Sequence, residues 1–155
     1  MQSALSHGKL GVIDEGEVHL SRRPVARQTF VTERIDDRVD LLTMALGADD
    51  RLIRYAAASG ARAVVLQGFG RGNANSMVAA AVADIVASGV PVIVTSRCPE
   101  GFVRPIYGNG GGKDLEKAGA IFAGDLSGQK ARILAAVLLG VEMTWDDLRA
   151  AFASL

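Results

Sequence analysis

A glycine-rich loop, Gly68-Phe69-Gly70-Arg71-Gly72-Asn73, is the segment of this sequence best suited to bind a small polar ligand. Its glycines allow the backbone to adopt unusual dihedral angles and to come close to a ligand. The side-chain amide of Asn73 can both donate and accept hydrogen bonds. This combination suits a ligand that carries an amino or a carboxylate group. The alternative is a tight strand-to-helix turn in which Asn73 or Asn75 is the N-cap of the next helix.

The spacing of this loop does not match the common nucleotide-binding loops. The dinucleotide pattern G-x-G-x-x-G, started at Gly68, requires a glycine where Asn73 stands. The next apolar segment ends in Thr95 and Ser96, so the acidic residue that would bind a ribose is missing. The loop also does not continue as Gly-Lys followed by Ser or Thr, as a Walker A loop would. The sequence therefore argues against nucleotide binding.

A second loop, residues 96–113, begins with Ser96 and Arg97 and contains four glycines between positions 108 and 112. Arg97 could bind a carboxylate, because the guanidinium group matches its geometry, but a structural salt bridge that closes the loop is the favoured alternative. Cys98 precedes a proline and has no paired histidine, which argues against a thiol nucleophile. No cluster of His, Cys and carboxylate residues has the spacing of metal ligands, so we expect no metal site.

The elements that would position these loops alternate between apolar strands and alanine-rich helices. Wholly apolar segments are typical of strands buried on both faces of a parallel sheet. The alternation predicts an α/β fold: a small doubly wound (Rossmann-like or flavodoxin-like) parallel sheet with helices on both faces. Ligands bind at the carboxyl ends of such strands, so the two loops should lie together. The predicted strands are 39–44, 63–66, 90–95 and 120–122, and the main predicted helices are 50–59, 76–87, 115–118, 129–139 and 145–152.

Shorter patterns predict the N-terminal region and the helix ends. Residues 10–13 and 18–20 flank a turn signal, Asp14-Glu15-Gly16, and predict a β-hairpin. Residues 28–35 alternate and predict a partly exposed strand or an extended connection. Expected N-caps are Asp49 or Asp50 for the first helix, Asp125 or Ser127 for the fourth, and Thr144, with Asp147 in a capping box, for the last.

Length, charge and composition exclude several classes of protein. The chain has 155 residues, which suits one domain, and 17 basic and 17 acidic residues give it no net charge. A neutral chain has no electrostatic reason to bind nucleic acid or an anionic membrane. No apolar run approaches the roughly 20 residues that span a bilayer. The single cysteine, Cys98, suits a reducing compartment, and we expect a cytoplasmic location.

Four motifs, taken in order, resemble the C-terminal domain of bacterial-type L-asparaginases. Residues 7–13, His-Gly-Lys-Leu-Gly-Val-Ile, are similar to the segment that opens this domain. Residues 64–73 resemble its strand and glycine-rich loop, and residues 92–101 resemble its next strand and loop. Residues 124–132, Gly-Asp-Leu-Ser-Gly-Gln-Lys-Ala-Arg, resemble the start of a later helix. The resemblance implies an asparaginase C-terminal-type α/β domain over residues 1–155, without the N-terminal catalytic domain.

This resemblance implies hydrolysis of L-asparagine to L-aspartate and ammonia without a cofactor, and some family members also act on glutamine. In the family, a threonine of the N-terminal domain attacks the side-chain amide and forms an acyl-enzyme. The C-terminal domain reaches into the active site of a neighbouring subunit, which implies a homo-oligomer. Its main contribution is the asparagine of the glycine-rich loop, which corresponds to Asn73. The implied substrate-binding residues are Gly70, Arg71, Gly72 and Asn73.

The sequence departs from the family pattern at the nucleophile. None of its five threonines is followed by glycine, so the family motifs Thr-Gly-Gly-Thr and Thr-Gly-Thr-Asp are both absent. We therefore assign no catalytic residue and expect negligible activity from this chain alone. The threonines are Thr29, Thr32, Thr43, Thr95 and Thr144.

A second departure concerns the loop at 96–113. In the family, a glutamate of this loop often contacts the substrate amino group, but its place falls near Tyr107 and Gly108, where no carboxylate stands. The candidates in this loop are therefore Ser96, Arg97 and Tyr107.

Two other functions fit the same residues. The chain could be a noncatalytic module that binds an amino acid or assembles with a separate N-terminal domain. It could also be an asparaginase-like part of an amidotransferase. Contact with tRNA would be expected to bring a basic patch, and the balanced charge argues against that second alternative.

Overall fold

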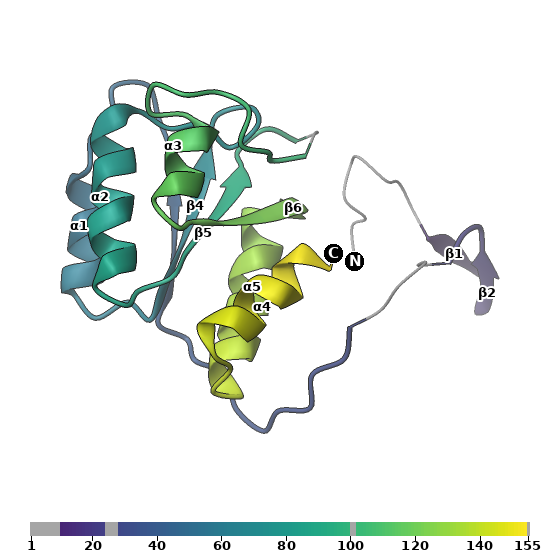
Figure 1. Cartoon of the computed structure of the whole chain (residues 1–155). Helices are drawn as coiled ribbons and strands as arrows, with labels where there is room; N and C mark the ends of the chain where they lie inside the picture. Colours follow the sequence, from purple (N-terminus) through teal and green to yellow (C-terminus); the bar gives the residue numbers. More distant parts are fainter. Residues whose placement is uncertain (1–9, 24–27, 100–101, 155) are drawn as a thin grey trace.

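The computed structural model describes residues 10–23, 28–99 and 102–154, and Figure 1 shows their arrangement. Within these residues, a hairpin is followed by alternating strands and helices. The elements are β1 (Gly11–Asp14), β2 (Glu17–Leu20), β3 (Val39–Thr43), α1 (Arg51–Ala58), β4 (Ala63–Gly68), α2 (Ser76–Ala87), β5 (Val92–Ser96), α3 (Gly112–Lys117), β6 (Ile121–Ser127), α4 (Gly128–Gly140) and α5 (Trp145–Ala153).

The main sheet is parallel, and its four strands lie in the order β3-β4-β5-β6. Helices α1, α2 and α3 pack on one face, and α4 and α5 pack on the other (Figure 1). Each strand lies beside the one before it, so the three connecting helices share a face and the other face is covered by the two helices after β6. The structure confirms the predicted α/β class, the parallel sheet with helices on both faces, and the N-terminal hairpin.

The apolar strands β4 and β5 form the centre of two hydrophobic cores. Successive side chains point to opposite faces of a sheet, so Val64 and Val94 pack towards α1 and α2, whereas Val65 and Ile93 pack towards α4 and α5. Because both faces are covered, these side chains are fully buried. The continuous apolar segments in the sequence have this physical cause.

The hairpin forms as the turn signal predicted. Glu15 and Gly16 occupy the two central positions, both with positive φ angles, 45° and 86°. Two-residue turns of this kind follow the twist of antiparallel strands. β1 and β2 pair with each other and form a separate two-stranded sheet.

Three sequence predictions differ from the structure in detail. β6 extends to Ser127, well beyond the predicted 120–122, because its pairing with β5 shifts register and resumes at Ser127. α4 therefore begins at the next residue, and Ser127 stands at its N-cap without a side-chain capping bond. Asp50 stands at the N-cap of α1 but also makes no capping bond, since its carboxylate pairs with Arg54. The Asp49 carboxylate instead accepts from the Arg51 backbone N–H at 3.1 Å, at the start of this helix.

Residues 28–35 form no strand, so the extended connection is the correct alternative. Gln28 instead holds this segment against the last helix, because its side-chain amide donates a hydrogen bond to the Ala151 carbonyl at 2.9 Å.

The predicted capping box at the start of α5 is present. The Asp147 backbone N–H donates to the Thr144 hydroxyl oxygen at 3.2 Å, and the Thr144 backbone N–H donates to the Asp147 carboxylate at 3.1 Å. The Thr144 hydroxyl also donates to that carboxylate at 2.6 Å. These hydrogen bonds, from the hydroxyl first and the backbone second, hold the pKa of Asp147 below its usual value. The cap starts the helix that carries Leu148 and Phe152 into the core.

This cap predicts a pH-dependent effect of Asp147→Asn on stability. A carboxylate whose pKa is lowered by folding stabilises the folded chain above its unfolded pKa, about 3.9, and loses this effect as the pH falls through the folded pKa. We expect the variant to have a lower urea midpoint than the wild type near pH 7, and the difference to shrink steadily below about pH 4. Asp146→Asn, in the same turn but outside the capping box, is the control and should change the midpoint little. A difference that is equally large near pH 7 and near pH 2 would contradict the assignment.

Candidate functional site

Loops after three neighbouring strands meet at the carboxyl edge of the main sheet. Parallel strands end at a common edge, which is where ligands bind in such folds. The Arg104 backbone N–H donates to the Arg71 carbonyl at 3.1 Å, and the Asn75 side chain donates to the Ala48 carbonyl at 2.8 Å. The two loops singled out in the sequence therefore lie together, as predicted. The three loops are residues 44–50 after β3, 69–75 after β4 and 97–111 after β5.

Asn73 joins the glycine-rich loop to the second loop. Its side-chain oxygen accepts a hydrogen bond from the Gly112 backbone N–H at 3.1 Å, and its side-chain nitrogen donates to the Phe69 carbonyl at 3.4 Å. The residue is half-buried. An amide has two N–H groups and an oxygen with two lone pairs, so these contacts leave one donor and one acceptor for a ligand.

The N-cap of α2 is Asn75. Its side-chain oxygen accepts from the Val78 backbone N–H at 2.9 Å. Of the two asparagines that the sequence analysis considered as N-caps of this helix, only Asn75 caps it. Asn73 has no such role in α2 and instead fixes the contact between the loops.

The other predicted residues of the glycine-rich loop differ in exposure. Gly72 is buried with φ at 90°, and a Cβ atom there would lie 2.8 Å from Val94 Cγ1, so glycine is required for packing on β5. Gly70 and Arg71 are exposed at the edge of the sheet. Their side of the loop is open to a ligand, whereas Gly72 supports the loop from beneath.

Ser96 and Arg97 connect loops, and neither contacts a carboxylate of residues 10–23, 28–99 or 102–154. The Ser96 hydroxyl donates to the Gly70 carbonyl at 2.5 Å. Arg97 donates to the Met44 carbonyl at 2.9 Å, and its guanidinium carbon lies 5.4 Å from the centre of the Phe69 ring. The sequence favoured a salt bridge at Arg97, and Arg97 makes none with the residues that the structure describes. The partners of Arg97 are a backbone carbonyl and an aromatic ring. The residue types at the end of a strand do not indicate such partners.

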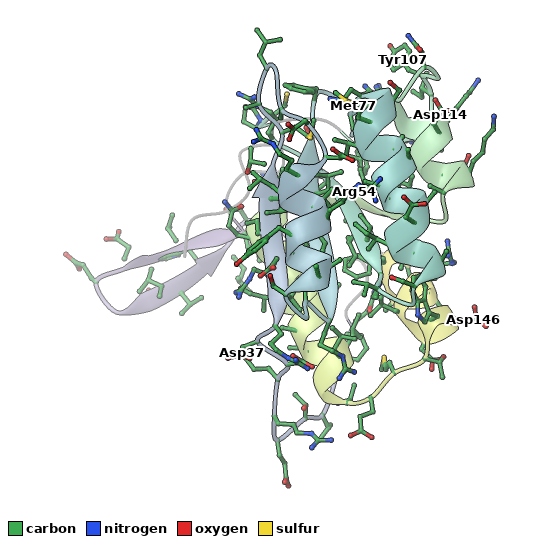
Figure 2. The ribbon with its side chains drawn as sticks, turned by 90° about the vertical axis from the view of Figure 1, so that its left-hand side faces the viewer. Asp37, Arg54, Met77, Tyr107, Asp114 and Asp146 are labelled. Atoms are coloured by element: carbon green, nitrogen blue, oxygen red, sulfur yellow. The ribbon has the colours of Figure 1, made fainter. Side chains whose placement is uncertain are left out.

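Tyr107 lies at the same end of the molecule as Met77 and Asp114, opposite Asp37 and Asp146 (Figure 2). Its side chain is exposed, and its backbone carbonyl accepts from the Lys113 N–H at 2.9 Å. Tyr107 is therefore at the rim of the candidate site.

Asp114 is a supporting residue that the sequence prediction missed. Its carboxylate accepts from the Gly110 backbone N–H at 2.6 Å and so holds the turn that precedes Gly112, the partner of Asn73. Gly110 has φ at 83°, and a Cβ atom there would lie 2.2 Å from the Ser76 nitrogen. The sequence feature that could have indicated this role is the position of Asp114, soon after a run of glycines and in the first turn of a helix.

The site offers polar and backbone groups rather than metal ligands. Within residues 10–23, 28–99 and 102–154, no group of three or more His, Cys, Asp or Glu side chains could hold a metal ion. In the same described ranges, no helix is both long and apolar enough to cross a membrane. The arrangement can position a small polar ligand at the edge of the sheet.

Comparisons with known proteins agree with this geometry. The model of the Glutaminase/Asparaginase C-terminal domain family matches residues 38–152. The protein named "Probable L-asparaginase" of Deinococcus radiodurans is 34% identical over 151 residues, which cover 94% of this chain and 45% of that protein. A component of the glutamyl-tRNA(Gln) amidotransferase of Halobacterium salinarum is 33% identical over 96 residues, which cover 61% of this chain and 22% of that protein.

A solved structure shows the same fold. The thermostable L-asparaginase from Thermococcus kodakarensis aligns with a TM-score of 0.77 at 21% identity, covering 92% of this chain and 44% of that one. The chain thus spans less than half the length of each of these proteins. With the family model matching most of its residues, the chain belongs to the asparaginase family as a Glutaminase/Asparaginase C-terminal domain.

Proposed function

We propose that this chain forms one part of an amidohydrolase active site that converts L-asparagine and water to L-aspartate and ammonia. The observation that carries the proposal is Asn73, which is half-buried where two loops meet and retains one donor and one acceptor for a ligand. The α-amino and α-carboxylate groups of an amino acid are suitable partners for such an amide.

The covalent chemistry is assigned to a threonine outside these 155 residues. In the family, its hydroxyl attacks the side-chain amide carbon, ammonia leaves, and water then hydrolyses the acyl-enzyme. The present chain would hold the amino acid while this exchange takes place. A homo-oligomer or a separate catalytic domain, a cytoplasmic location, and possible use of glutamine belong to the same proposal.

A second function is a noncatalytic module that binds an amino acid within a larger assembly. The similarity to a component of an amidotransferase supports keeping this alternative. The absence of net charge gives no support to direct contact with nucleic acid. Ligand binding distinguishes a site at Asn73 from a purely structural module, and ammonia release with a catalytic partner distinguishes an enzyme from a binding protein.

Asn73→Ala should weaken the binding of L-aspartate by about 10-fold to 100-fold, since a hydrogen bond to a charged group contributes about 1.5–3 kcal/mol. Isothermal titration of the chain with L-aspartate measures this. Asn75→Ser is the comparison variant. Serine preserves the cap of α2 and leaves Asn73 in place but loses the hydrogen bond to the Ala48 carbonyl, so it measures the effect of loosening the adjacent loop. Equal affinities in wild type and Asn73→Ala would remove Asn73 from the site.

The chain by itself should release ammonia from L-asparagine no faster than buffer. The physical reason is that the family's threonine motifs are absent from the sequence. A coupled ammonia assay on the purified chain provides the test. Turnover at an ordinary enzymatic rate that disappears in Asn73→Ala would show that another nucleophile is present in this chain.

Asp114→Ala should also weaken L-aspartate binding, but less than Asn73→Ala does. Without the carboxylate, the Gly110 N–H loses its acceptor and the turn before Gly112 becomes looser, so Asn73 is held less firmly. Asp114→Asn keeps an acceptor oxygen at this position and should restore most of the affinity. If asparagine and alanine at position 114 weaken binding equally in the titration, hydrogen bonding to Gly110 is not the cause.

A further inference from the structure

Two pairs of arginines are joined by the same kind of backbone hydrogen bond, at opposite edges of the main sheet. At the amino edge, just before β3 and β4, the Arg62 N–H donates to the Arg38 carbonyl at 2.7 Å. At the carboxyl edge, in the loops after β4 and β5, the Arg104 N–H donates to the Arg71 carbonyl at 3.1 Å. All four residues are exposed. The two pairs therefore differ mainly in what surrounds them.

A carboxylate accompanies the pair at the amino edge. The Asp36 carboxylate lies 4.0 Å from Arg38 Nε and 3.9 Å from Arg62 Nε, and the Asp36 side chain is only 19% exposed. One anion thus lies beside both guanidinium groups. Positive charges that the fold brings close together repel each other, and a shared carboxylate offsets this repulsion.

The pair at the carboxyl edge has no such carboxylate in the part of the chain that the structure describes. Neither Arg71 nor Arg104 makes an ion pair with a carboxylate of residues 10–23, 28–99 or 102–154. Their guanidinium groups therefore keep all their donors for an anion that comes from outside these residues.

The carboxylates of the loops at this edge are already engaged. Among the described residues of the three loops that meet there, the acidic ones are Asp49 and Asp50. Both pair with arginines of α1, Asp49 with Arg51 at 2.7 Å and Asp50 with Arg54 at 2.6 Å. The described part of this edge thus has an excess of positive charge, although the chain as a whole has no net charge.

The arginine pair is part of the same edge as the Asn73 amide. Arg71 is two residues before Asn73 in the glycine-rich loop, and Arg104 belongs to the loop that Asn73 contacts through Gly112. The free donor and acceptor of Asn73 suit the amino and carboxylate groups of an amino acid. A guanidinium pair nearby suits a further carboxylate, because guanidinium N–H groups match carboxylate oxygens in geometry and charge.

We infer that Arg71 and Arg104 form a carboxylate-binding subsite at the rim of the candidate site, where a ligand carboxylate takes the place that Asp36 has at the amino edge. The inference rests on the proposed function, because the ligand is the amino acid held by Asn73. The pair favours L-aspartate, which has a second carboxylate and a net negative charge, over L-asparagine, which is a zwitterion without net charge. The domain would then bind the product of the proposed reaction more tightly than the substrate.

Isothermal titration of the 155-residue chain with L-aspartate, L-asparagine and succinate tests this preference. Succinate has two carboxylates but no amino group, so its binding reports on the arginine pair. The test variant is the double substitution Arg71→Gln with Arg104→Gln, which removes both charges and keeps the backbone hydrogen bond between the loops. Arg38→Gln with Arg62→Gln is the matched control, because it removes the same two charges at the opposite edge.

We expect the test variant to bind L-aspartate and succinate several-fold more weakly, up to about 30-fold, which is what two exposed ion pairs contribute. Its affinity for L-asparagine should change little, and each single substitution should cause part of the loss. The wild-type preference for L-aspartate should shrink at about 1 M salt, where the Debye length is about 3 Å. The control variant should bind all three ligands as the wild type does.

Equal losses of affinity for L-aspartate and L-asparagine in the test variant overturn the inference, and so do equal losses in the test and control variants. A wild-type chain that binds neither L-aspartate nor succinate also overturns it. A Tm of the test variant close to that of the wild type verifies that its fold is intact, as expected for two exposed side chains.

Asn73→Ala separates this inference from the proposed function. If Asn73→Ala changes no affinity while the arginine variant binds L-aspartate and succinate more weakly, the carboxylate subsite stands and the assignment of Asn73 fails. If Asn73→Ala weakens the binding of both amino acids while the arginine variant binds them as the wild type does, Asn73 stands and the carboxylate subsite fails.

Discussion

The hydrogen bond from the Gly112 N–H to the Asn73 side chain is the contact on which the candidate site depends. It requires the backbone of the second loop to approach the Asn73 side chain of the glycine-rich loop. The register of β4 and β5 brings the loops to one edge, but only glycine permits the final approach. A Cβ atom at Gly111 would lie 2.6 Å from the Tyr107 carbonyl oxygen and 2.9 Å from the Asn73 side-chain oxygen. Gly110, Gly111 and Gly112 are therefore required for packing at the site, whereas a Cβ atom at Gly108 would meet nothing within 4 Å.

The position of the site could be predicted from the sequence, whereas its supporting contacts could not. Apolar strands alternating with helices place the loops after residues 68 and 96 at one edge, whatever the side chains do. The partners of Arg97 and Asp114 are backbone groups, the Met44 carbonyl and the Gly110 N–H. Every residue carries such a carbonyl, and every residue except proline carries such an N–H. A sequence cannot indicate which of many equivalent carbonyls or N–H groups a side chain will reach. The sequence therefore favoured a salt bridge at Arg97 and assigned no role to Asp114.

For the hairpin, too, the sequence predicts only part of the structure. Its turn could be predicted from Asp14-Glu15-Gly16, because few residue types accept two consecutive positive φ angles. The apolar face of the hairpin could not be predicted from the sequence, because Val12 and Ile13 are adjacent apolar residues that point to opposite sides. Only the pairing register shows that Ile13 shares a face with Val18 while Val12 lies opposite His19. A single residue of slippage would mix the two faces.

Packing differs between the body of this domain and its surface. The α/β body has two cores, one on each face of its sheet, and its last helix begins with a complete capping box. Among the features left open are a half-buried amide at the sheet edge and exposed apolar side chains, such as Leu46 in the loop after β3 and Ile13 on the hairpin. The Asn73 amide makes two hydrogen bonds of its own and keeps one donor and one acceptor, so it can bind a polar ligand without giving up the contact between the loops.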